Sequence, residues 1–290
     1  MEPLVIFCKS YRNDVLRAKT LVESIQKYNK EKFPLYISVP ESDLELFREK
    51  LAGLTFTLLK DEDILQLNPR HSLQLMHEIP GGLMQQIIKA EFWRTGLCRN
   101  YLMIDSDAYF IRDFGIRDFM YDDETPYTVL HEGKDLLEFA ARRGMMKKIK
   151  SGYGLSMDVA EKYFNRPRRV FNFGPIPIIC STAVWQALDE QFSVPRNLSF
   201  YDLLKIFPSE MYWYGESMLK YQSVRLIPVE PFFKVFHYVG QYEESLMLGM
   251  TEEMLAEMFL GVIKQSNWDR QSDFIPRKRR TWKTLWLKKR

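Results

Sequence analysis

Runs of consecutive apolar residues alternate, early in the chain, with stretches in which apolar residues recur every three or four positions. The continuous runs at 4–8, 33–40 and 56–60 are typical of buried strands. Between them, 15–25 has apolar residues at helical spacing, and a second stretch with a helix-like start at Ser42 or Asp43 ends at Gly53. This β-α-β-α-β order predicts a parallel sheet covered by helices.

The pattern then leads to an acidic motif. After an irregular segment at 61–80, residues 81–96 predict a helix flanked by glycine at both ends, and the apolar run at 100–105 predicts a strand. That strand ends in Asp105-Ser106-Asp107. In open α/β sheets, ligands bind beyond the carboxyl ends of the strands. Position alone therefore makes Asp105 and Asp107 candidate site residues.

Beyond this motif the pattern is less regular. We expect a strand at 125–132, a charged helical region at 134–169 and a strand-like segment at 170–181 that Pro175 and Pro177 interrupt. The remaining expected elements are helices at 182–192, 208–222 (N-cap Ser209) and 251–265 (N-cap Thr251), a strand at 224–229, and a strand or loop at 232–240.

Composition fits one ordinary globular domain. The chain has 290 residues, of which 46% are hydrophobic and 27% charged, and it contains no internal repeat or low-complexity linker. We expect a single α/β domain over residues 1–268, followed by a basic amphipathic tail at 269–290.

Positive charge is concentrated in that tail. Residues 277–290 contain eight Lys or Arg and no acid, whereas the whole chain has a net charge of +3, so that the remainder carries −5. A basic body would favour nucleic acid as a partner, and this distribution does not. Trp282, Leu285 and Trp286 lie among the cations at helical spacing, which is typical of segments that bind an anionic membrane surface. A disordered basic terminus is the alternative.

Other features indicate the compartment. The three cysteines, Cys8, Cys98 and Cys180, are widely spaced in apolar contexts, which favours buried free thiols in a reducing compartment. The first residues lack the basic region of a signal peptide, and no stretch approaches the roughly 18 apolar residues that span a bilayer. We expect a cytoplasmic protein, peripheral on the inner face of the plasma membrane if the tail binds there.

The aspartate pair has three interpretations. Two carboxylates at the mouth of a strand can hold Mn²⁺ or Mg²⁺ together with a diphosphate. One aspartate could instead be a hydrolase nucleophile and the other its acid/base. The haloacid-dehalogenase pattern of that kind has Thr or Val where this chain has Tyr109, and it follows the first strand, so it fits poorly. The third interpretation is structural: the pair ends a strand and caps a turn.

The wider context favours the first interpretation. The stretch IIKAEFWRTGLCRNYLMIDSDAYFIRDF resembles the DxD region of GT-A fold glycosyltransferases, in which a lysine-bearing helix precedes an apolar strand that ends in Asp-x-Asp. GGLMQQIIK further resembles bacterial DUF6492-type proteins associated with surface polysaccharide loci, most clearly over residues 81–114. Ser209-Glu210 and Tyr214-Gly215 resemble the same group more weakly. The resemblance implies a Rossmann-like GT-A domain with a nucleotide-binding half at 1–133 and an acceptor half at 134–268.

The resemblance also implies roles for individual residues. Asp105 and Asp107 would bind the metal, Asp105 with the nucleotide diphosphate as well, and His237 would be a third metal ligand or a pyrophosphate contact. The remaining donor contacts would come from Lys89 on the helix before the motif and from Lys9, Ser10 and Arg12 after the first strand. Solvated loop residues are the plain alternative for the last three.

Acceptor chemistry points to the second half. An inverting transferase needs a carboxylate to take a proton from the acceptor hydroxyl, and Glu210, then Glu216, is our candidate. Asn172 and Gly174 could approach the donor sugar, and His131-Glu132 could line the cleft. The aromatic residues Tyr212, Trp213 and Tyr214 fit a core better than a sugar-stacking surface.

Together these observations predict a metal-dependent glycosyltransferase. It would move a sugar from a UDP- or GDP-linked donor to a glycan or lipid-linked acceptor in surface polysaccharide biosynthesis. Two alternatives remain: a nucleotidyltransferase of related fold, although the glycine-rich basic loop of that class is missing after the first strand, and a non-catalytic nucleotide-sugar-binding protein.

Overall fold

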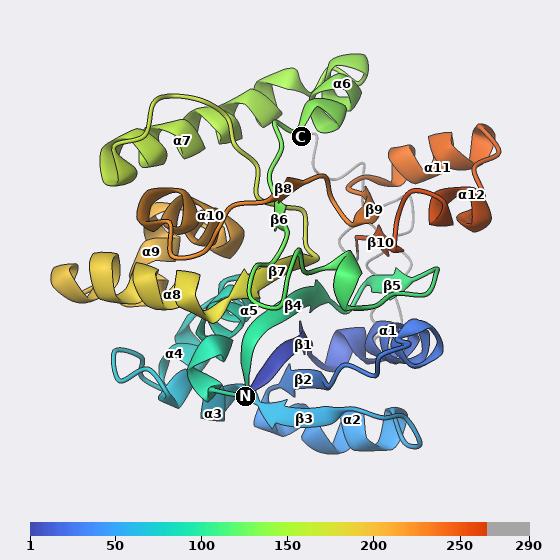
Figure 1. The fold of residues 1–290 in the computed structure, drawn as a ribbon, viewed down its shortest axis with the longest axis horizontal. Coiled ribbons are helices and arrows are strands. Elements are labelled where there is room, and N and C mark those ends of the chain that lie inside the picture. Colours follow the sequence, from blue (N-terminus) through green and yellow to red (C-terminus); the bar gives the residue numbers. More distant parts are fainter. Residues whose placement is uncertain (266–290) are drawn as a thin grey trace, which may run out of the picture.

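The computed structural model describes residues 1–265, and its largest sheet has five strands in the order β3-β2-β1-β4-β7. Their bounds are β1 Glu2–Lys9, β2 Leu35–Val39, β3 Thr57–Lys60, β4 Cys98–Asp105 and β7 Ile178–Ser181. The first four strands are parallel, and β7 pairs antiparallel with β4. The predicted fold class, a mostly parallel central sheet flanked by helices in a single domain, is confirmed (Figure 1).

Strand β1 is buried on both faces, which explains its continuous apolar run. Leu4, Ile6 and Cys8 face a cluster with α1 (Val15–Tyr28) and α2 (Leu44–Lys50). The predicted apolar positions of α1, from Val15 to Ile25, are its buried residues. Asp43 is not a side-chain cap of α2: it lies in a short 3₁₀ turn and accepts hydrogen bonds from Arg12.

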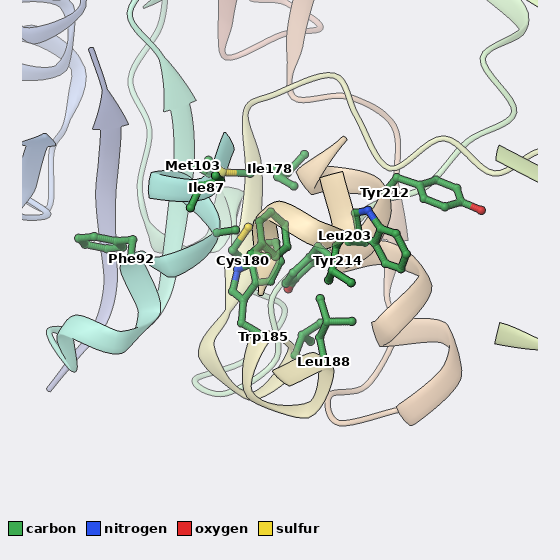
Figure 2. Packing of buried hydrophobic residues seen from close by; sticks show 14 of the residues in the cluster. Ile87, Phe92, Met103, Ile178, Cys180, Trp185, Leu188, Leu203, Tyr212 and Tyr214 are labelled. Atoms are coloured by element: carbon green, nitrogen blue, oxygen red, sulfur yellow. The ribbon is translucent and has the colours of Figure 1, made fainter. Parts of the chain in front are cut away.

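The other face of the sheet packs against α5 (Gly81–Glu91), α8 (Thr182–Leu188), α9 (Phe200–Ile206) and α10 (Glu210–Tyr221). Figure 2 shows this packing, with Trp185 next to Cys180 and Tyr214. The ring centroids of Trp185 and Tyr214 are 5.1 Å apart. Tyr212, Trp213 and Tyr214 are all buried, so the core interpretation of these aromatic residues is confirmed. All three cysteines are buried free thiols, as expected.

A second, three-stranded sheet has the order β5-β10-β9, with β5 Ala108–Phe110, β9 Phe233–Phe236 and β10 Gly261–Lys264. The helix predicted over 251–265 is therefore wrong in its second half. Only α12 (Glu252–Ala256) forms, capped by Thr251 as expected. The strand pairing requires glycine at position 261, because a Cβ there would meet the Phe233 ring at 2.2 Å and the Tyr109 carbonyl oxygen at 2.4 Å.

The remaining elements surround these two sheets. The segment expected to be irregular contains α3 (Asp61–Gln66) and α4 (Leu75–Glu78). Strands β6 (Thr128–Val129) and β8 (Pro228–Val229) form a two-stranded sheet, and the charged helical region comprises α6 (Lys134–Arg142) and α7 (Met146–Phe164). Helix α11 (Val239–Met247) precedes α12. Within residues 1–265, none of the helices combines the length and apolar character that crossing a bilayer requires.

Candidate functional site

The carboxyl ends of β1 and β4 lie side by side at a large cavity. Lys9 and Asp105, the last residues of these strands, are partners in the sheet register. Asp105, Ser106 and Asp107 line a cavity of about 1090 Å³. The ends of β1, β2 and β3 contribute Lys9, Ser10, Glu41 and Asp61 to the same wall, and the start of α5 contributes Gly81 and Met84. The structure thus brings the Asp-x-Asp motif together with two of the predicted residues after the first strand.

Lys89 compensates the first aspartate. Its side chain projects from α5, is only 2% exposed, and donates a hydrogen bond from Nζ to Asp105 Oδ1. Burial alone would lower the pKa of Lys89, but the charges of Asp105 and Glu210 outweigh it and raise that pKa. Lys89 is therefore a permanent cation at neutral pH, next to one oxygen of the motif.

Glu210 lies behind this lysine. Its Oε1 is 3.5 Å from Lys89 Nζ, and its side chain is 6% exposed. Burial raises the pKa of Glu210, and Lys89 counteracts that shift. Glu210 begins α10 after the N-cap Ser209, whose hydroxyl accepts from Tyr212 N as predicted. Among the described residues, Glu210 contacts Lys89 and is not part of the cavity wall.

Glu216 occupies a different environment. Its carboxylate is completely buried and accepts two hydrogen bonds from Arg166, at 2.8 Å from Nε and 2.6 Å from Nη2. This geometry is a bidentate ion pair, in which both carboxylate oxygens are engaged. The structure therefore brings Glu210, and not Glu216, to the group around Asp105.

Asp61 lines the candidate site, and our sequence interpretation missed it. Its Oδ2 lies 2.8 Å from Lys9 Nζ in a close ion pair, with side-chain exposures of 1% for Asp61 and 6% for Lys9. Burial raises the pKa of Asp61, and the charge of Lys9 counteracts it. Asp61 directly follows β3, so the rule that selected Asp105, an acid at the carboxyl end of a strand, could have selected it too.

Ser10 and Arg12 differ in position: Ser10 is part of the described cavity wall, whereas Arg12 is not and has an exposed side chain. Ser10 Oγ lines the cavity, is buried, and has no hydrogen-bond partner among the described residues. A buried hydroxyl without a partner is costly, which makes it a candidate for a ligand contact. Arg12 instead donates to Asp43 from both its backbone N and its Nε, at 2.8 and 2.9 Å.

His131, Asn172 and Gly174 form a second cluster that is not part of the described wall of this cavity. His131 Nδ1 accepts a hydrogen bond from Gly133 N at 3.0 Å, so its Nε2 carries the proton and donates to the Gly174 carbonyl oxygen. Asn172 Oδ1 accepts from Gly174 N at 3.1 Å. These bonds give His131 and Asn172 a defined structural role around the Pro175 and Pro177 segment.

His237 follows β9 and approaches the motif through the small sheet. Lys264 N donates to the Asp107 carbonyl oxygen at 3.4 Å, and Lys264 pairs with Phe236 across the sheet. Two strand spacings place the backbones of Asp107 and Phe236 roughly 10 Å apart. Burial, together with the charge of Lys234, lowers the pKa of His237 and favours the neutral imidazole.

The donor set at the motif suits a hard divalent cation. Asp105 and Asp107 offer carboxylate oxygens at the cavity wall, which are the ligands that Mn²⁺ and Mg²⁺ take. Within residues 1–265 there is no cluster of three or more His, Cys, Asp or Glu side chains arranged to hold a metal. The two aspartates would therefore share the ion with ligand oxygens and water.

Residues 3–219 match the model of a family of unknown function (DUF6492). The chain belongs to this family. The match extends from β1 into α10 and thus includes the Asp-x-Asp motif, Lys89 and Glu210. No curated protein sequence matches the chain.

Among solved structures, the apo crystal structure of mouse xyloside xylosyltransferase 1 matches 91% of this chain and 98% of its own. The TM-score is 0.49 and the sequence identity 9%. A sequence identity this low shows neither the activity nor the substrate of this chain, so function has to be inferred from the residues of the site.

Proposed function

We propose that this member of the family is a metal-dependent glycosyltransferase of GT-A type that uses a nucleotide-sugar donor. The observation that carries the proposal is the Asp-x-Asp motif at the carboxyl end of β4, on the wall of a cavity of about 1090 Å³. That volume lies at the upper end for small-molecule sites and accommodates a ligand as large as a nucleotide sugar.

The charge of the cavity supports a metal. Among the residues that the structure describes, one Lys or Arg, Lys9, lines it together with six acids: Asp14, Glu41, Asp61, Glu62, Asp105 and Asp107. Arg17, Lys60, Lys9 and Lys89 pair with four of these acids, and a divalent cation would offset the remaining negative charge that faces a nucleoside diphosphate. In the proposal, Asp105 and Asp107 hold Mn²⁺ or Mg²⁺, which when bound neutralises charge that develops on the leaving diphosphate. Ser10 and Asp61 would then contact the nucleoside.

Lys89 and Glu210 act as positioning residues in this proposal. Lys89 fixes the orientation of the Asp105 carboxylate, and Glu210 fixes Lys89. The expected role of Glu210 or Glu216 as acceptor base receives little support, because each carboxylate is buried against a cation and away from the described cavity wall. The predicted contacts of Asn172, Gly174 and His237 with the ligand remain predictions.

The finer expectations are part of the same proposal. We infer a UDP- or GDP-linked donor and a glycan or lipid-linked acceptor of surface polysaccharide synthesis, used at the cytoplasmic face of the membrane. The halves at 1–133 and 134–268 would serve donor and acceptor. The tail at 269–290, with its predicted membrane contact through 277–290, lies outside the described residues.

The nucleotidyltransferase alternative is less consistent with the structure. Such an enzyme needs basic groups that approach a triphosphate after the first strand, and here Arg12 pairs with Asp43 and is not part of the described cavity wall. A panel of nucleotide sugars tested for Mn²⁺-dependent hydrolysis distinguishes the cases. Turnover should be lost in Asp107→Asn and retained in Asp113→Asn, a surface acid with 60% side-chain exposure.

Each class gives a different outcome in this panel. A nucleotidyltransferase would release pyrophosphate from a nucleoside triphosphate, and a binding protein would bind a donor without turnover. Either result would contradict the transferase proposal. If a sugar is transferred, the anomeric configuration of the product, measured by NMR, would decide between inversion and retention.

A further inference from the structure

Helices α11 and α12 and the residues just after each of them carry a concentration of exposed apolar side chains. The two helices lie next to each other beyond β9 and β10 (Figure 1). Leu246, Met247 and Leu248 are 54%, 79% and 73% exposed, and Met254 and Met258 are 50% and 65% exposed. Single exposed apolar residues are ordinary, but a group of this size within 246–258 indicates a binding surface.

The same surface is strongly acidic. Residues 239–260 contain five glutamates and no Lys or Arg: Glu243, Glu244, Glu252, Glu253 and Glu257. Glu244 accepts a hydrogen bond from Arg142, and Glu252 accepts one from the Tyr109 hydroxyl. Glu243, Glu253 and Glu257 are exposed. Flexible methionines beside carboxylates are suited to a partner that is both apolar and basic.

We propose that this acidic methionine surface, residues 239–260, is the docking site for the chain's own basic segment, residues 277–290. The segment RKRRTWKTLWLKKR carries eight cations and no acid, and Trp282, Leu285 and Trp286 recur at the spacing of one helix face. Its apolar residues can pack on the methionines and leucines of the surface, and its cations can pair with the glutamates. Five glutamates would repel an anionic membrane from the same surface.

The chain leaves the described structure next to this surface. Gln265 lines a cavity of about 340 Å³ together with Tyr242 of α11, and Lys264 Nζ lies 4.7 Å from the centroid of the Tyr242 ring. The residues between Gln265 and Arg277 span up to roughly 40 Å when extended. A helix of the length of α11 measures roughly 14 Å. The basic segment can therefore reach the surface within one chain, at an effective concentration on the order of millimolar.

Contacts of α11 and α12 connect this surface with the candidate site. Glu252 of α12 accepts from the Tyr109 hydroxyl at 2.6 Å, and Tyr109 lines the smaller cavity with Asp107. The same cavity wall includes Tyr242 of α11. The proposal requires no glycosyltransferase activity, since it depends only on the surface and on the segment.

Carbodiimide cross-linking of the full chain, followed by peptide mass spectrometry, tests this docking. We expect cross-links from Lys283, Lys288 and Lys289 to the exposed glutamates, with Glu253 as the reference carboxylate. The double variant Glu243→Lys/Glu257→Lys leaves Glu253 intact and should reduce its cross-links about tenfold, because two attractions become repulsions. The control Glu23→Lys/Glu49→Lys, at carboxylates 52% and 70% exposed on α1 and α2, should leave them unchanged.

Two further measurements keep the test decisive. Mixed ¹⁴N- and ¹⁵N-labelled chains should give no mixed-isotope cross-links; mixed products would show a second copy as the occupant and overturn the intramolecular docking. Release of the segment in Glu243→Lys/Glu257→Lys should strengthen binding to phosphatidylglycerol vesicles. Equal vesicle binding by both chains, or wild-type cross-links that avoid 239–260, would equally refute the docking.

Discussion

Lys89 gives the sharpest test of how the site is held together. It is the buried cation between Asp105 and Glu210, with side-chain exposures of 2%, 37% and 6% respectively. In Lys89→Met, Asp105 can still be hydrated, but Glu210 is left as a buried carboxylate without its cation. Removing one partner of a buried pair costs roughly 3–5 kcal/mol, so we expect a loss of about 3 kcal/mol in the free energy of unfolding at pH 8.

The pH dependence identifies the carboxylate responsible. Burial already raises the pKa of Glu210, and loss of Lys89 raises it further. A carboxyl group with a raised pKa favours the folded protein when it is protonated, and this contribution is lost as pH rises through that pKa. The deficit of Lys89→Met relative to wild type should therefore shrink toward pH 6, by up to about 1.4 kcal/mol for each pH unit.

Urea denaturation followed by circular dichroism at pH 6 and pH 8 provides the measurement. In Lys89→Met/Glu210→Met, most of the lost stability should return, since an apolar pair replaces the buried charges. The matched control Lys205→Met removes a lysine that is 53% exposed and pairs with Asp202, and it should cost at most about 1 kcal/mol. A Lys89→Met chain within about 1 kcal/mol of wild type at pH 8 would refute this account of the buried pair.

Three further predictions concern packing, a histidine and a carboxylate. In Gly215→Ala, the new Cβ would meet the Phe173 ring at 2.1 Å, so thermal denaturation should show a loss of about 1–3 kcal/mol in the free energy of unfolding. In Gly82→Ala, the new Cβ meets nothing within 4 Å, so the free energy of unfolding should be unchanged or raised by up to about 1 kcal/mol. His237 has a lowered pKa, so the neutral side chain stabilises the folded protein above the ordinary histidine pKa, and this stability is lost as pH falls. Denaturation curves of His237→Gln should lack this decline in stability between pH 7 and pH 5. An unchanged decline would contradict the assignment of this effect to His237. Glu216→Gln should lower the unfolding free energy measured in urea but leave nucleotide affinity within twofold, because both oxygens of its buried carboxylate are engaged by Arg166. A large loss of affinity would instead place Glu216 in the site.

The main sheet was predictable because local pattern determines it. The apolar runs of β1, β2 and β4 read as buried strands, and the spacing of Val15 to Ile25 located α1. The position of Asp105 followed from the rule that ligands bind at the carboxyl ends of parallel strands. The same rule could have identified Asp61, but the irregular pattern after β3 obscured the end of that strand.

The features that could not be predicted from the sequence depend on contacts between residues that are distant along the chain. The pairing of Glu210 with Lys89 joins α10 to α5, and that of Glu216 with Arg166 joins α10 to the end of α7. Neither pair has a local signal. The short apolar run at 261–264 is compatible with a helix or a strand, and only its neighbours β5 and β9 make it β10.

The central claim, that Asp105 and Asp107 hold a metal with a nucleoside diphosphate, is tested most directly by calorimetry. Titration of the full chain with UDP and GDP should show binding in Mn²⁺ that weakens at least about tenfold when the metal is chelated. Asp107→Asn should lose the Mn²⁺-dependent part, and Asp113→Asn should keep it. Nucleotide affinity that is equal with and without Mn²⁺, or unchanged in Asp107→Asn, would contradict the account.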